Sequence, residues 1–263
     1  MTIEPPLPLS VCMIAGPEAH RIRRALDSVA GWTSEIIVVI NDDTSDGTDR
    51  IAASYGARVF REPWKGHVAQ KNSAADKATQ PWILGLDADE VVSPPLRSEI
   101  AGLLAQPQPP EQAAAFCFPR CSFYCGRWIR HGDWYPDRQT RLWQRGHAHW
   151  GGIDPHDKLL VDGPVNRLRH DLLHYSMESL EHQTRKTLKY ADEFVRLCAE
   201  QGQTAGFLDL LMRPVWRFWR AYLFRLGFLD GWQGFAIAWM TAFYTFLRYA
   251  RVREAQVQKA LSR

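Results

Sequence analysis

Between residues 9 and 104 the chain alternates short apolar runs, rich in β-branched residues, with segments of helical periodicity. This alternation constrains the fold more than any other feature, because it is typical of a parallel sheet covered by helices. The apolar runs predict strands at 10–15, 35–40, 58–61 and 82–86. The periodic segments between and after them predict helices at 19–29, 48–55, 68–78 and 94–104.

The rest of the chain has a different character. Further strands are predicted at 114–118 and 140–144, and a helix at 180–200. Charge is nearly balanced, with 32 Lys and Arg against 29 Asp and Glu and a net charge of +3. This is too little to indicate a protein that binds duplex nucleic acid, so no nucleic-acid partner is expected. Neither GxGxxG nor GxxxxGK[ST] occurs, which disfavours dinucleotide oxidoreductases and P-loop enzymes.

Residues 83–90, Ile-Leu-Gly-Leu-Asp-Ala-Asp-Glu, run an apolar strand directly into an Asp-x-Asp pair. Alternate residues of an extended chain point the same way, so Asp87 and Asp89 present two carboxylates to one place. Carboxylate oxygens are the ligands that Mg²⁺ and Mn²⁺ prefer, and the pair therefore indicates a metal ion that holds a diphosphate. The alternative is a solvated acidic turn that closes the strand, because Asp-x-Asp pairs are common.

A second polar cluster, Asn41, Asp42 and Asp43, follows the predicted strand 35–40. Ligands of such sheets bind beyond the carboxyl ends of the strands, where both clusters fall. Amide and carboxylate side chains at this place suit hydrogen bonds to a nucleobase and a ribose, whereas a plain capped turn is the structural alternative.

Several ordered motifs resemble those of family 2 glycosyltransferases with the GT-A fold. Over residues 9–100 they are Ser10–Ile14 followed by Glu18, Glu35–Asn41 with Ser45–Thr48, Gln70-Lys71-Asn72 and Trp82–Glu90. Further on, the chain is similar to the bacterial subgroup that includes lipopolysaccharide-core glucosyltransferases. The motifs there are Trp134–Arg138, Arg141-Leu142, Pro155–Leu159, His174–Ser176 and Gly227–Gly231.

The resemblance implies an α/β GT-A fold, in which a mixed Rossmann-like sheet has helices on both faces, followed by an amphipathic helical extension. It also implies a nucleotide-diphospho-sugar donor, such as UDP-glucose, an inverting displacement and a divalent metal. By the same resemblance Asp89 would bind the metal, with Asp87 and His156 as further candidate ligands. The donor nucleotide would contact Asp87 together with Glu18, Asn41, Asp43 and Lys71. In two places the chain departs from the family pattern, because Pro17-Glu18 stands where Asn-Glu is common and Asn41 where aspartate is common.

Transfer of the sugar also needs a base that activates the acceptor hydroxyl. The resemblance favours Asp157, which follows a histidine, and Asp154 is its competitor. His156 either binds the metal, orients the base or is a structural histidine. Arg138 and Arg141 are candidates for gripping a phosphate or an acidic acceptor, and ordinary ion pairs at the margin of the sheet are the alternative.

The last sixty residues combine aromatic residues with arginines. Residues 231–247 carry no charge, and the length of this segment is at the lower limit for a membrane span. Arg213, Arg217 and Arg220 share one arc of a helix. This pattern favours a peripheral or monotopic attachment to an anionic membrane surface, at the cytoplasmic face of the bacterial inner membrane. The alternative is that the aromatic residues pack on the catalytic domain or a second subunit.

We therefore predict a GT-A catalytic domain over residues 1–176, with a donor-binding half at about 9–105 and an acceptor half at about 113–176. A helical membrane-association region would follow over 177–263. The predicted activity is transfer of a hexose, such as glucose, from a nucleotide-diphospho-sugar to a lipopolysaccharide core or a similar bacterial surface glycolipid. The alternatives are a polyprenyl-phosphate hexosyltransferase and a non-catalytic membrane-associated scaffold that retains the fold.

Overall fold

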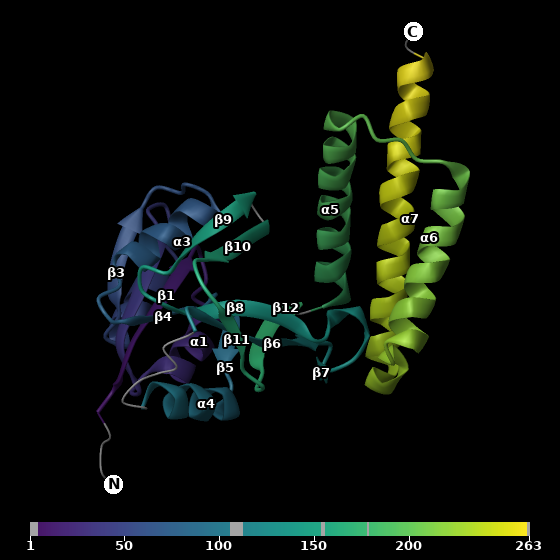
Figure 1. The fold of residues 1–263 in the computed structure, drawn as a ribbon. Helices are drawn as coiled ribbons and strands as arrows, with labels where there is room; N and C mark the ends of the chain where they lie inside the picture. The colour runs from purple at the N-terminus through teal and green to yellow at the C-terminus, as the bar shows by residue number, and fades with distance from the viewer. Residues whose placement is uncertain (1–4, 106–112, 154–155, 178, 262–263) are drawn as a thin grey trace. The chain divides into compact units, whose positions relative to one another are not determined.

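The computed structural model describes residues 5–105, 113–153, 156–177 and 179–261 (Figure 1). The chain forms two compact units. The first, called here the sheet unit, consists of Met1–Arg120 and Asp137–His174. The second, called the helical unit, consists of Cys121–Pro136 and Tyr175–Arg263.

The sheet unit is built on a mixed sheet with the strand order β3-β2-β1-β4-β8-β6-β12-β5. Strand β1 is parallel to β2 and β4, and β8 is antiparallel to β4 and β6. This confirms the mixed α/β sheet expected of a GT-A fold. The strands are β1 (Leu7–Ala15), β2 (Thr33–Asn41), β3 (Arg58–Glu62), β4 (Trp82–Gly85), β5 (Glu90–Val92), β6 (Ala115–Tyr124), β8 (Asp137–Gln144), β11 (Val165–Arg167) and β12 (Leu172–Met177), with a separate hairpin of β9 (Ala148–Ile153) and β10 (His156–Val161).

Helices cover both faces of this sheet. Along β1, Leu9, Val11 and Met13 point into one core and Cys12 into the other, because alternate residues of a strand face opposite ways. The first core includes apolar residues of α1 (Ile22–Val29) and α4 (Pro94–Leu104), and the second includes Ala74 of α3 (His67–Asp76). The remaining helix of the unit is α2 (Thr48–Ser54).

The predicted strands and helices of this region are confirmed with small shifts of their ends, except at the start of α1. That helix begins at Ile22 rather than at residue 19. The backbone N–H groups of Glu18 and Ala19 donate to Thr48 Oγ1 and Asp46 Oδ2, each at 2.9 Å. These bonds tie the loop after β1 to the loop after β2, and so hold residues 18 and 19 in a turn.

The end of β3 provides a test of stability against pH. The ammonium of Lys77 donates to Glu62 at 2.6 Å, and this bond, together with one from Ser73, lowers the pKa of Glu62 to about 2. In the unfolded chain a glutamate has a pKa of about 4.3. A depressed pKa stabilises the fold above the unfolded value, and this contribution is lost as the pH falls toward 2. Urea unfolding from pH 6 to about 2 is expected to show a shallower loss of stability for Glu62→Gln than for the wild type.

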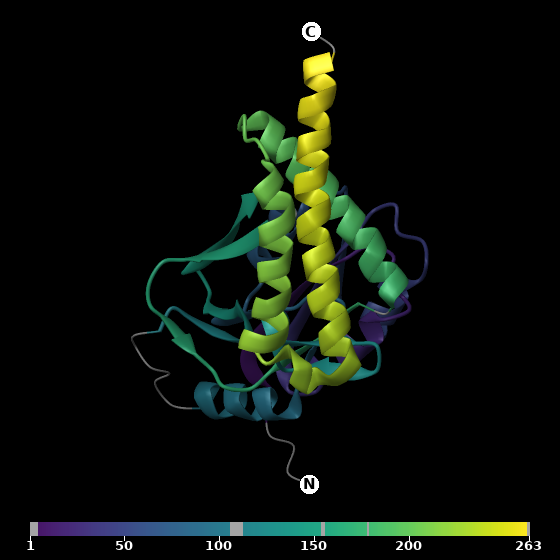
Figure 2. The same ribbon diagram turned by 90° about the vertical axis from the view of Figure 1, so that its right-hand side faces the viewer.

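The helical unit contains three long helices: α5 (Leu180–Glu200), α6 (Phe207–Trp219) and α7 (Gly231–Leu261). The prediction of a helix over 180–200 is confirmed, and Ser179 caps it by accepting from the His182 N–H at 3.1 Å. Helices α6 and α7 lie side by side, as Figure 2 also shows. Short turns η2 (Arg220–Phe224) and η3 (Gly227–Asp230) join them. The unit also contains β7 (Arg127–Ile129), η1 (Gly132–Trp134) and the last residues of β6 and β12. None of the described helices is both long and apolar enough to cross a bilayer.

Candidate active site

Asp87 and Asp89 lie in the turn that follows β4, at the carboxyl end of the strand. The carbonyl of Asp87 accepts from the Glu90 N–H at 2.9 Å, and the Asp87 N–H donates to the Glu90 side chain at 3.0 Å. These two bonds fix the shape of the turn. Both aspartate side chains remain partly accessible, with exposed fractions of 28% for Asp87 and 19% for Asp89.

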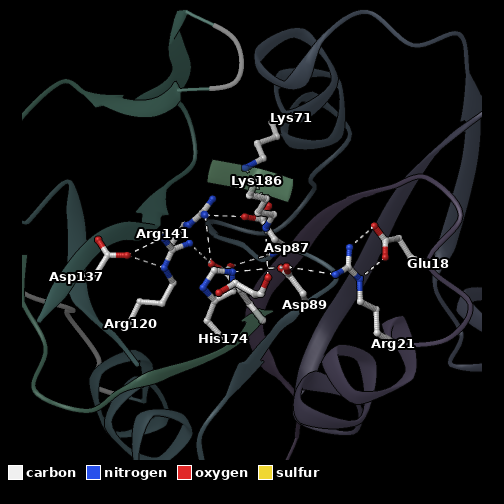
Figure 3. Close-up of polar contacts among 12 residues, drawn as sticks. Glu18, Arg21, Lys71, Asp87, Asp89, Arg120, Asp137, Arg141, His174 and Lys186 are labelled. Carbon is white, nitrogen blue, oxygen red and sulfur yellow. Dashed lines mark hydrogen bonds and ion pairs between the residues drawn. The ribbon is translucent and has the colours of Figure 1, made fainter. Parts of the chain in front are cut away.

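Two buried cations flank the Asp87 carboxylate (Figure 3). Lys71 Nζ lies 2.9 Å from Asp87 Oδ1, and Arg141 Nη2 lies 2.7 Å from Oδ2. Burial alone would raise the pKa of Asp87, but the charges of Arg141 and Lys71 outweigh it and hold this pKa well below its usual range. Asp87 is therefore ionised at neutral pH. The sequence had not indicated that both cations would reach it.

Arg141 reaches the turn from an irregular position in β8. Phe116 pairs with Leu142 and Cys117 with Thr140, so Arg141 is the extra residue of a β-bulge. Bulges re-aim a side chain, and here Arg141 is only 4% exposed. Its Nε and Nη1 atoms have no hydrogen-bond partner among the described residues. Buried donors of this kind are costly unless they are paired, so Arg141 is equipped to bind a further anion.

Trp150 on β9 lies against both cations. Its ring centroid is 4.6 Å from Lys71 Nζ and 5.0 Å from the guanidinium carbon of Arg141. Asn72 holds the strand to α3, because its side-chain amide exchanges two 2.8 Å hydrogen bonds with the Trp150 backbone. The hairpin partner β10 then places Asp157 Oδ2 2.9 Å from Lys71 Nζ. Lys71 thus joins the Asp-x-Asp turn to the predicted base.

Asp89 belongs to a second chain of polar contacts, also drawn in Figure 3. Its Oδ2 lies 3.7 Å from Arg21 Nη1 and 3.6 Å from His174 Nε2, and Arg21 in turn binds Glu18. Burial raises the pKa of Asp89, but the contact with His174 and the charge of Arg21 bring it below its ordinary value. The carboxylate of Asp89 suits Mn²⁺ or Mg²⁺ when phosphate oxygens and water complete the shell, whereas the imidazole of His174 suits a transition metal rather than Mg²⁺.

Glu90 and Arg120 form buried ion pairs next to the Asp-x-Asp turn, and the sequence indicated a role for neither of them. Glu90 is fully buried, and its Oε1 lies 3.0 Å from Arg120 Nη1 and 3.3 Å from Arg141 Nη2. Arg120 also binds Asp137 at 2.6 Å. The sequence carried one sign of the role of Glu90. This glutamate directly follows the Asp-x-Asp pair, and an exposed turn does not require a third acidic residue there.

Glu90→Gln is expected to impair the site without abolishing the fold. The amide keeps the shape of the side chain but no longer neutralises Arg120 and Arg141, and such a loss in a buried network costs about 1–3 kcal/mol. Chemical denaturation measures this loss, and a fall of about tenfold in the catalytic rate of the site is expected to accompany it, which corresponds to about 1.4 kcal/mol. Glu99→Gln on α4, at an exposed loop contact, is the matched control. Equal stability of the two variants would contradict this role of Glu90.

The remaining predicted residues lie apart from this cluster or outside the described chain. Asn41 ends β2, where its amide lies close to Gly16, and Asp43 is exposed in the turn that follows. Arg138 is exposed on β8, opposite Pro119 of β6. Asp154 and the side chain of His156 lie outside the described residues. The site that the structure assembles therefore consists of Asp87, Asp89, Lys71, Arg141 and Asp157, with Glu18 linked to it through Arg21.

Comparison with known proteins places this arrangement in a family. The family model for glycosyl transferase family 2 matches residues 10–161, which include the Asp-x-Asp turn, Lys71, Arg141 and Asp157. The chain belongs to glycosyl transferase family 2. The resemblance of the sequence motifs to this family is thereby confirmed, and the protein is a glycosyltransferase.

Relatives of this family 2 glycosyltransferase match it over nearly its whole length. The uncharacterized glycosyltransferase RP128 of Rickettsia prowazekii is 30% identical, over 95% of this chain and 88% of its own. The lipopolysaccharide core biosynthesis glycosyltransferase LpsC of Rhizobium meliloti is 28% identical, over 97% of this chain and 96% of its own. Among solved structures, S. aureus TarS 1–349 has a TM-score of 0.47 at 13% identity, with 95% of this chain and 91% of that chain covered.

Proposed function

We propose that this glycosyltransferase moves a hexose from a nucleotide-diphospho-sugar to a lipopolysaccharide core or a similar bacterial surface glycolipid, with inversion at the transferred carbon. One observation carries the proposal. Two ionised carboxylates at the end of β4 share one place with buried cations and a further carboxylate, Asp157. The full-length similarity to LpsC supports the choice of acceptor.

On the donor side, Asp89 would hold a Mg²⁺ or Mn²⁺ ion, with His174 as a further ligand of Mn²⁺. When bound, this ion would neutralise charge on the departing diphosphate as a Lewis acid. Arg141 would donate its two unpartnered N–H groups to a phosphate, and Lys71 would add a second fixed positive charge. Asn41 and Asp43, at the end of β2, would contact the base and the ribose, and Glu18 would support them from the loop after β1.

On the acceptor side, Asp157 would accept the proton of the attacking hydroxyl. Its contact with Lys71 fixes the position of the carboxylate, and a positioned base contributes on the order of 10²- to 10⁴-fold. Asp154 remains the alternative base. Arg138, exposed on β8, is the candidate for binding an acidic group of the acceptor. Trp150 covers Lys71 and Arg141 and so would help to exclude water from the donor.

The acceptor also suggests a location. The helical unit carries exposed apolar residues along α6 and α7, among them Trp216, Trp219, Trp232 and Trp239 at 48–60% exposure. Tryptophans beside arginines favour the boundary between lipid headgroups and acyl chains. We therefore place the protein at the cytoplasmic face of the bacterial inner membrane, attached peripherally through 177–263.

The direct test is incubation of the purified chain with UDP-glucose, Mn²⁺ and core-defective lipopolysaccharide, with UDP release as the readout. Turnover is expected, and NMR should show an inverted anomeric configuration in the product. Asp157→Asn is expected to lower the rate by about 10²-fold or more, whereas Asp162→Asn, exposed beyond β10, should leave it unchanged.

One outcome would contradict the proposed acceptor, and another would contradict the proposed base. Turnover with a polyprenyl phosphate but not with lipopolysaccharide would favour the polyprenyl-phosphate alternative, in which the acceptor phosphate needs little help from a base. Full activity of Asp157→Asn on lipopolysaccharide would show that a different group is the base, with Asp154 next to be substituted.

A further inference from the structure

Three arginines of the helical unit surround one carboxylate. Arg217 Nη1 and Arg220 Nη1 each lie 3.5 Å from Asp133 Oδ2, and Arg225 Nε lies 3.5 Å from Oδ1. The side chain of Asp133 is 10% exposed, whereas the arginines are 31–46% exposed. The cluster therefore has an excess of two positive charges, carried by arginine side chains that are partly exposed.

The backbone around this cluster is held closely. Gly132, at a φ of +75°, donates its N–H to the Arg225 carbonyl at 2.8 Å. The turn η2 is a single π-helical turn, closed by a 2.9 Å bond from the Arg225 N–H to the Arg220 carbonyl. Asp230 accepts from the backbone N–H of Arg130 at 3.1 Å and of His131 at 2.8 Å. Turns of the π type often occur at functional sites, and this one brings two arginines five residues apart to the same carboxylate.

The polar atoms of the cluster are not satisfied by one another. Neither oxygen of Asp133 has a hydrogen-bond partner among the described residues, and the same holds for the buried Nε of Arg217. The three contacts are thus ion pairs without the shorter separation of a charged hydrogen bond. A structural salt bridge would normally be shorter, whereas arginines spread around a central charge leave their N–H groups available to a ligand.

The surface beside the cluster is apolar, and the segment that carries it is rich in arginine. Trp216, Trp219 and Phe224 are 57%, 48% and 65% exposed. From residue 210 to 253 the sequence has seven arginines and one acidic residue, Asp230, which is 2% exposed. This surface is complementary to an anionic bilayer both in charge and in apolar character.

We propose that Arg217, Arg220 and Arg225 form a binding site for the phosphomonoester headgroup of an anionic membrane lipid. The excess of two positive charges matches a phosphate dianion, and guanidinium groups pair with phosphate oxygens in a bidentate manner. The site rests on the proposed membrane location, and none of its residues has a proposed role in sugar transfer. It would fix the depth and orientation of the helical unit at the surface.

Vesicle flotation tests this site without donor or acceptor, so its result is independent of the proposed activity. Vesicles of phosphatidylcholine with phosphatidic acid, a phosphomonoester, are compared with vesicles of equal surface charge that contain phosphatidylserine, a phosphodiester. The test variant is Arg217→Gln with Arg220→Gln, in which Arg225 still pairs with Asp133. The control, Arg251→Gln with Arg253→Gln, removes the same charge near the C-terminal end of α7. Thermal melting and Mn²⁺–UDP binding verify the fold of each variant.

The wild type is expected to prefer phosphatidic acid. The test variant should bind these vesicles roughly thirtyfold more weakly, as two arginines at a membrane surface predict, and should lose the preference. The control should keep the preference. Equal binding of the wild type to both vesicles, or an equal loss in both variants, would overturn the site in favour of general electrostatic attraction. Calorimetric binding of inorganic phosphate to the wild type, without any binding to vesicles, would overturn the assignment of the cluster to a lipid.

Discussion

Asp89→Asn is expected to lower the kcat/KM of sugar transfer by about a thousandfold, because a metal that neutralises the leaving diphosphate contributes several kcal/mol. Asparagine has nearly the same size and shape as aspartate, so the substitution removes the negative charge beside Arg21 and His174 without leaving a gap. Two measurements apply: initial rates of UDP release over a range of donor concentrations, which give kcat/KM, and calorimetric titration of UDP in the presence and absence of Mn²⁺. The variant should lose the metal-dependent part of UDP binding.

The matched control for this substitution is Asp162→Asn, which removes the same charge from an exposed position beyond β10. It should retain wild-type transfer and wild-type UDP binding. Transfer by Asp89→Asn within threefold of the wild type would remove the basis of the proposed function. Loss of transfer with unchanged metal-dependent binding would instead assign Asp89 to the chemical step rather than to the metal.

Arg141→Met is expected to reduce both stability and activity. The substitution leaves Asp87 with Lys71 alone and Glu90 with Arg120 alone, and removal of one partner from a buried ion-pair network costs about 3 kcal/mol. Transfer should fall by about 10²- to 10³-fold, because the loss of one preorganised donor to a developing anion has this magnitude. Urea denaturation and UDP release measure the two effects separately.

Arg145→Met, just beyond the end of β8, is the control, because its side chain is exposed and surface substitutions stay within about 0.5 kcal/mol. A partial rescue by Arg141→Lys would indicate that charge alone suffices. No rescue by lysine would indicate that the planar donor geometry is required. If Arg141→Met were as stable and as active as the control, the buried guanidinium would have no role in the site.

Much of the sheet unit could be predicted from its sequence. The strands near 10–15, 35–40, 58–61 and 82–86 are confirmed as β1 to β4. They could be predicted because a short run of β-branched apolar residues indicates a buried strand without information from distant parts of the chain. The start of α1 was predicted three residues too early, because helical periodicity carries no information about the bonds from Glu18 and Ala19 to the loop after β2. The assignment of domains at residue 176 stays a prediction.

The candidate site was only partly predictable. The position of Asp87 and Asp89 at the end of a strand could be predicted from residues 83–90 alone. Arg141 was a candidate for binding phosphate, but its burial against Asp87 depends on a bulge in the pairing of β8 with β6. Glu90 and Arg120 had no assigned role, since a buried ion pair between residues thirty positions apart leaves no periodic pattern. The roles of Asp157, Asn41, Asp43 and Arg138 remain proposals.

By itself, the sequence determined the family, the order of strands and helices in the first hundred residues, and the strand end that carries the Asp-x-Asp pair. These properties depend on residues close together in the chain. Only the tertiary structure decided that Lys71 joins Asp87 to Asp157, that His174 lies beside Asp89, and that three arginines surround Asp133. Such contacts depend on strand register and on the packing of distant segments, and these are decided when the whole chain buries its apolar surface.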